Sequence, residues 1–164
     1  MANTIGKTFD NGFAGSYSRQ PDQIIDSHVT GTGGAAFGQA LVYSSGAVVA
    51  FGGSNVAADF VGVAAREVKT TAYGTSQGGY VAGEPASVMK RGRILVKCQN
   101  GTPALNGDVY IRTTLNASYP DAVVGGFEAA ADSTYSVKVT NLKWRGAADA
   151  NGIAELSILY PVNA

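Results

Sequence analysis

The sequence predicts an all-β protein, either a jelly-roll-like β-sandwich or a small β-barrel, with an extended N-terminal arm. Residues 62–98, GVAAREVKTTAYGTSQGGYVAGEPASVMKRGRILVKC, hold several short runs of β-forming residues that alternate in polarity. Turn-forming residues divide the rest of the chain into similar runs, roughly nine or ten in all, at a spacing typical of sandwiches and barrels. The 22 glycines among 164 residues are about twice the usual share.

Residues 1–38 form the predicted arm, because they contain few consecutive apolar residues and many small polar ones. Phe9, Phe13 and Tyr17 recur every four residues, which would make a stripe on a helix. Two glycines lie among them, however, and each would cost a helix about 1 kcal/mol. We therefore expect an extended arm with aromatic anchors that orders best against a neighbouring molecule. Residues 21–26 are long enough for one helical turn and no more.

Residues 39–164 form the predicted body, which begins with a hairpin. Two apolar runs, 40–43 and 47–51, flank Ser-Ser-Gly, a plausible short turn. The next run, 58–68, alternates with a period of two, and this pattern predicts a half-buried central strand.

After a glycine-rich excursion, the pattern predicts two closely spaced strands at 86–90 and 93–98. Ile94, Val96 and Cys98 share one face of the second strand. These two strands carry most of the positive charge of this region, which we interpret as a basic edge of the sheet.

The last third of the chain predicts further short strands. Residues 108–113 alternate cleanly, residues 122–127 form a shorter run, and the alanines of 128–132 favour a turn of helix. The alternation slips near Asn141, which indicates a β-bulge or a bend between two sheets. Residues 153–160 close the body as a final strand. Trp144, the sole tryptophan, is expected in the core.

Charge and composition exclude several classes of function. The 12 basic and 12 acidic residues balance, which argues against a protein that binds nucleic acid by general counterion release. Charged residues make up only 15% of the chain, so we expect partners to cover much of its surface. Apolar runs are too short to span a membrane. The N-terminal sequence lacks the pattern of a signal peptide, so we expect synthesis in a reducing cytoplasm.

Candidate catalytic and metal-binding residues are weak. Ser76 lies in a literal G-x-S-x-G, but a glycine-rich loop follows it and His28, the sole histidine, precedes it, so coincidence is the better interpretation. Asp22 and Asp26 near His28 supply too few ligands for zinc, and a lone Cys98 excludes an internal disulfide. We expect no catalytic residue, no metal and no cofactor.

The basic residues near the middle of the chain are the one concentration of charge, and two interpretations remain open. They either keep a solvated sheet edge from aggregating or face an acidic partner. The residues are Arg66, Lys69, Lys90, Arg91, Arg93 and Lys97.

Several segments together resemble one known family. GVAAREVKT, YVAGEPASVMKRGRILVKC, GDVYIRT, VGGFEAAAD and LKW…NGIAELSI are similar to the structural cement (capsid decoration) proteins of tailed double-stranded DNA bacteriophages. The resemblance runs from about Phe9 to Leu159 and is most specific in residues 62–98. It implies a β-sandwich or barrel on the outer face of the virion capsid, bound to the major capsid protein, as a homodimer or homotrimer. It implies no catalytic residue, nucleic acid or membrane.

A decoration protein would stabilise the shell against internal DNA pressure by bridging capsid subunits. The expected interface uses the arm and the basic residues, namely Phe9, Phe13, Tyr17, Arg19, Arg66, Lys90, Arg91 and Arg93. The alternative is a receptor- or glycan-binding β module on the virion surface. A small hydrolase using Ser76 is a third and weaker hypothesis.

Overall fold

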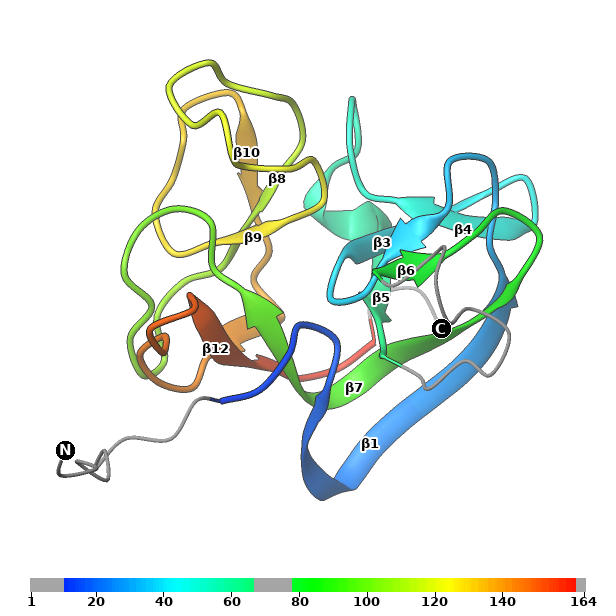
Figure 1. The fold of residues 1–164 in the computed structure, drawn as a ribbon, viewed down its shortest axis with the longest axis horizontal. Helices are drawn as coiled ribbons and strands as arrows, with labels where there is room; N and C mark the ends of the chain where they lie inside the picture. Colours follow the sequence, from blue (N-terminus) through cyan, green and yellow to red (C-terminus); the bar gives the residue numbers. More distant parts are fainter. Residues whose placement is uncertain (1–10, 67–77, 162–164) are drawn as a thin grey trace, which may run out of the picture.

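The computed structural model describes residues 11–66 and 78–161 and shows an all-β protein built from antiparallel sheets (Figure 1), which confirms the predicted fold class. In these ranges the one helical element is a 3-10 turn, η1 (Ala57–Asp59), and no helix has the length and apolar character needed to cross a membrane. The strands are β1 (Tyr17–Val29), β2 (Ala35–Ala36), β3 (Ala40–Ser44), β4 (Ala47–Ala50), β5 (Phe60–Ala64), β6 (Gly79–Tyr80), β7 (Pro85–Lys97), β8 (Tyr110–Arg112), β9 (Phe127–Glu128), β10 (Ser136–Lys138), β11 (Leu142–Trp144) and β12 (Ile153–Ile158).

β7 organises the largest sheet, which has the order β11-β12-β7-β5-β3-β4 with β1 also paired to β7. Met89 has partners on both β1 and β5, and Ile94 has partners on both β1 and β12. β1 therefore occupies one edge of β7, while β5 and β12 share the opposite edge at different ends. Figure 1 shows β1 running beside β7 along the base of the molecule.

The prediction of two strands within 86–98 is wrong, because β7 is one continuous strand of 13 residues. Gly92 has a φ of 122°, a conformation that L side chains rarely adopt, and it lets the strand change direction without ending. A Cβ at this position would lie 2.8 Å from the carbonyl oxygen of Asp22, so β1 also approaches closely here.

The three-stranded sheet, β10-β8-β9, contributes to the same core as the largest sheet, and this gives the molecule its sandwich character. In Figure 1 it forms the lobe that stands apart from β3–β6. The shared core includes Phe51, Phe60, Met89, Ile94, Val96, Val109, Ile111, Phe127, Leu142, Trp144 and Leu156. The burial of Trp144 confirms its expected place. A second, smaller cluster lies where the β2–β6 ladder meets β3, β5 and β7.

The slip in alternation near Asn141 marks a bend between sheets, as one of the two interpretations predicted. β10 pairs with β8 in the three-stranded sheet, whereas β11 pairs with β12 in the largest sheet. The chain thus crosses from one sheet to the other between Lys138 and Leu142.

The N-terminal segment is extended, but it is tied to its own body. Residues 21–26 belong to β1, so the predicted helical turn is wrong: Ile24, Ile25 and Asp26 pair with β7 instead of forming a turn whose backbone groups would stay open. Before β1, Gly15 donates its N–H to the Leu95 carbonyl at 2.7 Å and accepts from the Arg66 N–H at 2.7 Å. The division into an arm at 1–38 and a body at 39–164 stays a prediction.

The hairpin after residue 39 is confirmed, and two other local predictions are wrong. Ser45 and Gly46 both have positive φ, as a two-residue turn between twisted strands requires. In the region of 122–132, the strand covers only Phe127–Glu128 and the following residues are not helical, because β9 is a short partner of β8. β5 is buried on both faces rather than half-buried, since Phe60 and Val63 pack in the shared core while Val61 and Ala64 pack in the smaller cluster.

Substitution of Gly38 by alanine tests how tightly the N-terminal segment packs. Gly38 has a φ of 77°, and a Cβ there would lie 2.8 Å from the Ala14 Cβ and 2.9 Å from the Gly15 nitrogen. We expect Gly38→Ala to lower the free energy of unfolding by about 2–4 kcal/mol, from backbone strain plus overpacking. The measurement is urea denaturation.

Gly46→Ala is the matched control, because its φ is 80° and nothing lies within 4 Å of the added Cβ. It should cost only the strain of about 1–2 kcal/mol. Equal losses in the two variants would show that residues 14–15 do not pack against Gly38 as described.

Candidate interaction surface

The predicted interface residues fall into separate groups rather than one patch, and Phe9 lies outside the described residues. Phe13 is 67% exposed, and the Arg66 guanidinium lies 5.0 Å from the centre of its ring. Arg66 is also 5.1 Å from the ring of Phe37. Such cation–π contacts stabilise the aromatic ring on the body while leaving one of its faces in solvent.

Arg19 of β1 and Arg93 of β7 form a second group around one carboxylate. The Arg19 Nε lies 3.0 Å from Glu155 Oε1, and the Arg93 Nη1 lies 3.6 Å from the same oxygen. Glu155 belongs to β12, so this cluster spans three neighbouring strands. Tyr17 lies near it on β1 and is partly exposed.

Lys90 belongs to neither group, because it is only 5% exposed. Its Nζ lies 2.8 Å from Asp26 Oδ2 on β1 and 5.6 Å from the ring centre of Tyr43 on β3. The hydrogen bond from Lys90 lowers the pKa of Asp26 below its ordinary value. For Lys90, burial opposes ionisation, but hydrogen bonds with Asp26 and Tyr43 outweigh it and raise its pKa.

The interpretation of this region as a basic sheet edge is therefore wrong. β7 has partner strands on both sides, so its cations do not line an edge. Neighbouring strands supply acids instead: Asp26 faces Lys90, and Asp22 lies 3.1 Å from the Arg91 Nε. The sequence places these acids more than 60 residues away from their partners, which is why the charge run looked unpaired.

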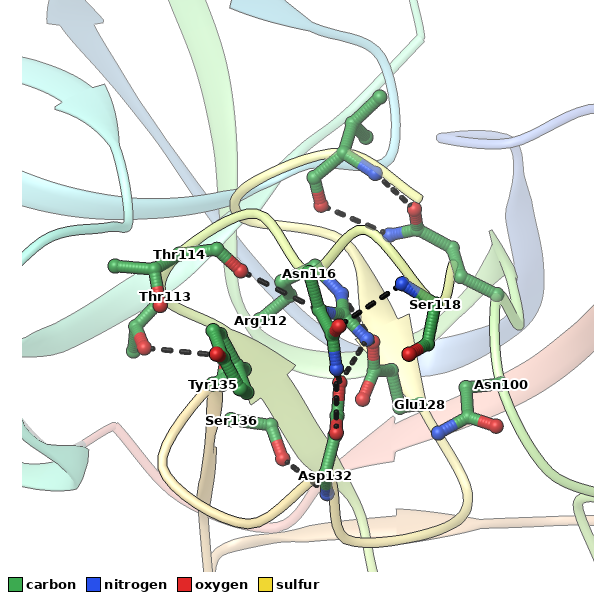
Figure 2. A network of polar contacts seen from close by, with 12 residues as sticks. Asn100, Arg112, Thr113, Thr114, Asn116, Ser118, Glu128, Asp132, Tyr135 and Ser136 are labelled. Atoms are coloured by element: carbon green, nitrogen blue, oxygen red, sulfur yellow. Dashed lines mark hydrogen bonds and ion pairs between the residues drawn. The ribbon is translucent and has the colours of Figure 1, made fainter. Parts of the chain in front are cut away.

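A buried polar network in the three-stranded sheet is the feature that sequence reasoning missed (Figure 2). Arg112 of β8 has no exposed surface, and its guanidinium lies 2.6 Å from Glu128 Oε1 on β9 and 2.7 Å from Asp132 Oδ2. Asn116 donates to both Asp132 oxygens at 3.0 Å. Alternation alone assigned Arg112 to the opposite face from Ile111, and nothing local in the sequence indicates that this face is also covered.

This network holds loops in place and does not present reactive groups. The Asn116 side chain accepts from the Ser118 N–H, and the Asp132 N–H donates to Ser136 Oγ, so the chain on each side of the ion pairs is fixed. Burial raises the pKa of Glu128, whereas the hydrogen bond from Asn116 lowers the pKa of Asp132. Because Arg112 and Glu128 have no exposed side-chain surface, a substrate in solvent does not reach them.

The other chemical candidates do not assemble into a site. His28 lies edge-on to the Tyr43 ring at 5.2 Å between ring centres, and no group of three metal-ligating side chains gathers within residues 11–66 and 78–161. Ser76 lies outside the described residues. What the described surface offers is an exposed aromatic side chain and shared ion pairs on a β body.

Comparison with known proteins identifies the family. The model of the structural cement proteins, typified by E217 gp24 and Pam3 gp6, matches residues 1–159, and the chain belongs to this family. The resemblance predicted from the sequence is thus confirmed. A chain from the solved capsid of Myoviridae phage XM1 has the same fold, with a TM-score of 0.70 and 18% identity over 96% of each chain. The comparison with curated proteins finds no match.

Replacing Arg112 by methionine tests the buried network. The substitution leaves the carboxylates of Glu128 and Asp132 without their guanidinium partner, so we expect the free energy of unfolding to fall by about 3–5 kcal/mol. Urea denaturation at neutral pH measures the change.

Arg91→Met is the control, since it breaks an ion pair in which both side chains are well exposed. Its loss should be below about 1 kcal/mol. If Arg112→Met were no more costly than Arg91→Met, the network would not stabilise the three-stranded sheet.

Proposed function

We propose that this chain is a decoration protein of the phage head. It is made in the host cytoplasm, binds the outer face of the capsid as a homodimer or homotrimer, and bridges neighbouring subunits of the major capsid protein. The observation that carries this proposal is the family match over residues 1–159, because cement proteins are structural components of the capsid.

The surface of the N-terminal segment supports contact with another molecule. Pairing with β7 satisfies much of the backbone of β1, yet this segment keeps large apolar side chains in solvent, namely Phe13, Tyr17, Ile24 and Val29. Burying such side chains against a partner gains free energy that the isolated chain forgoes. This segment is therefore our choice for the main capsid contact.

The mechanism is stabilisation by mass action. A protein that binds the assembled lattice but not the separated subunits shifts the equilibrium toward the lattice, by about 2.7 kcal/mol per site at a concentration one hundred times Kd. Because many copies bind one head, modest interfaces add up over the shell. The rigid body transmits load between the subunits that it touches.

Heads that lack this protein provide the direct test. Adding the purified chain should raise the temperature at which the heads release DNA, and the chain should co-sediment with heads but not with dissociated capsid protein. The measurements are a DNA-dye melting curve and sedimentation. An unchanged release temperature at saturating chain would contradict the proposal, and binding to host-surface glycans without binding to heads would favour a receptor-binding module.

Phe13→Ser tests the assignment of the N-terminal segment. Removing a ring that is 67% exposed should leave the fold intact and raise the Kd for heads about fivefold or more, as truncation of an interface aromatic does. Titration of labelled chain onto heads measures this.

Leu105→Ser is the matched control, because Leu105 is also 67% exposed but lies in the turn before β8. It should bind heads like the parent. Equal binding by the Phe13→Ser variant and the parent would remove this segment from the interface while leaving the capsid role untouched.

A further inference from the structure

One face of the largest sheet carries a row of residues that pairing brings together from four strands. Arg19 of β1 lies opposite Arg93 of β7, Arg93 lies opposite Ser157 of β12, and Ser157 lies opposite Lys143 of β11. Directly opposed residues of antiparallel strands point to the same side of the sheet. The other side at this level is core, with Ile94 and Leu156 buried.

The adjacent row on this face adds one acid and one more base. Glu155 is two residues before Ser157, and Arg145 is two residues after Lys143, so both point to the same side as the first row. The Arg145 N–H donates to the Glu155 carbonyl at 2.9 Å, which places these residues side by side.

Arginine opposite arginine is an unfavourable pairing, since like charges directly across a sheet destabilise it. A single Glu155 carboxylate offsets both Arg19 and Arg93. Arg145 contacts the Asn106 side-chain oxygen at 3.2 Å, and within the described ranges it has no carboxylate partner. Two of the three guanidinium groups thus share one acid, and the third is bound only to an amide oxygen.

The remaining charges near this face do not cancel the excess. Asp22 is occupied by Arg91 at 3.1 Å, and Asp108 is shared between Lys143 at 2.7 Å and Lys138 at 2.5 Å. When these groups are taken together with the three arginines and Glu155, the cations outnumber the acids. This face is therefore positive, although the net charge of the whole chain is zero.

The three arginines of these rows line a groove of about 420 Å³, and its one acid, Asp22, is paired with Arg91. The full lining is Arg19, Asp22, Gly92, Arg93, Arg145, Ser157, Ile158 and Leu159. Arg19, Arg93 and Arg145 surround it, Ser157 is nearly buried within it, and the half-exposed Leu159 forms part of its wall. A guanidinium presents two parallel N–H groups that match a carboxylate in plane, and Leu159 adds apolar contact for the stem of an acidic side chain.

We propose that this guanidinium groove binds an acidic segment of the major capsid protein, through carboxylates that complete the charge balance of Arg19, Arg93 and Arg145. The proposal rests on the proposed function for the identity of the partner. A protein acid fits better than nucleic acid, because a local groove with three arginines in a chain of zero net charge would neutralise few phosphates of a continuous backbone.

The test compares single variants that each remove one positive charge. At 50 mM NaCl, Arg19→Gln and Arg145→Gln should each raise the Kd for heads about threefold to tenfold, and the difference should shrink at 300 mM NaCl because salt screens exposed charges. Arg145→Lys, which keeps the charge, should recover part of the loss. Lys138→Gln, on the three-stranded sheet, should bind within about twofold of the parent.

A second measurement does not depend on heads. A ten-residue glutamate peptide should shift the backbone amide signals of Gly92, Ser157 and Leu159 in the parent, and should shift them less in Arg145→Gln.

Parent-like head binding by Arg19→Gln and Arg145→Gln, with no peptide shifts, would overturn the groove while leaving the capsid role standing. Parent chain that ignores heads would overturn the capsid role, whereas peptide shifts alone would still support the groove. Stronger shifts with a DNA duplex than with the peptide would overturn the choice of an acidic protein partner.

Discussion

The fold depends on one long strand that is paired on both sides. β7 receives β1 along one edge and β5 and β12 along the other, so the two halves of the largest sheet meet only through it. A break at Gly92 would separate β5, β3 and β4 from β12 and β11. A glycine at φ 122° lets the strand bend there while it stays continuous, and it leaves space for the close approach of β1.

The central place of β7 also determines what its charges can do. Lys90, Arg91 and Arg93 are neighbours in sequence, but their carboxylate partners come from two different strands, β1 and β12. The Lys90 side chain is buried and reaches a half-exposed acid, while the two arginines reach solvent. Three cations that are neighbours in the sequence therefore have different surroundings. Lys90 is a buried cation with a half-exposed acid, whereas Arg91 and Arg93 form ion pairs at the surface, where each pair contributes little to stability.

The sequence was sufficient for the features that depend on local chemistry. The 44–47 turn follows from Ser-Ser-Gly, whose last two residues adopt positive φ, and the alternation placed Ile94 and Val96 on one face, which packs in the core. The sequence alone was insufficient where a strand far away in the chain determines whether a residue is buried or paired. Arg112 is buried because Glu128 and Asp132 come to it from later in the chain, and residues 21–26 are a strand because β7 pairs with them. The guanidinium groove is of this second kind, since Arg19, Arg93 and Arg145 are more than 50 positions apart in the sequence and strand pairing brings them together.

A protein that works by holding two neighbours together benefits from a surface that does not reorganise when it binds. Ordering a loop or a side chain on binding costs entropy and lowers the affinity. Side chains that are already fixed in the free chain avoid this cost. The segment with Phe13 is held by the Gly15–Leu95 and Arg66–Gly15 hydrogen bonds, and Arg19 and Arg93 are oriented by their common acid. β1 is also irregular, with register shifts between residues 17 and 25, and such shifts discourage indiscriminate strand pairing at a sheet edge. The same pairing gives β1 a defined shape and satisfies part of its backbone, so a partner that contacts β1 would meet mainly its exposed side chains.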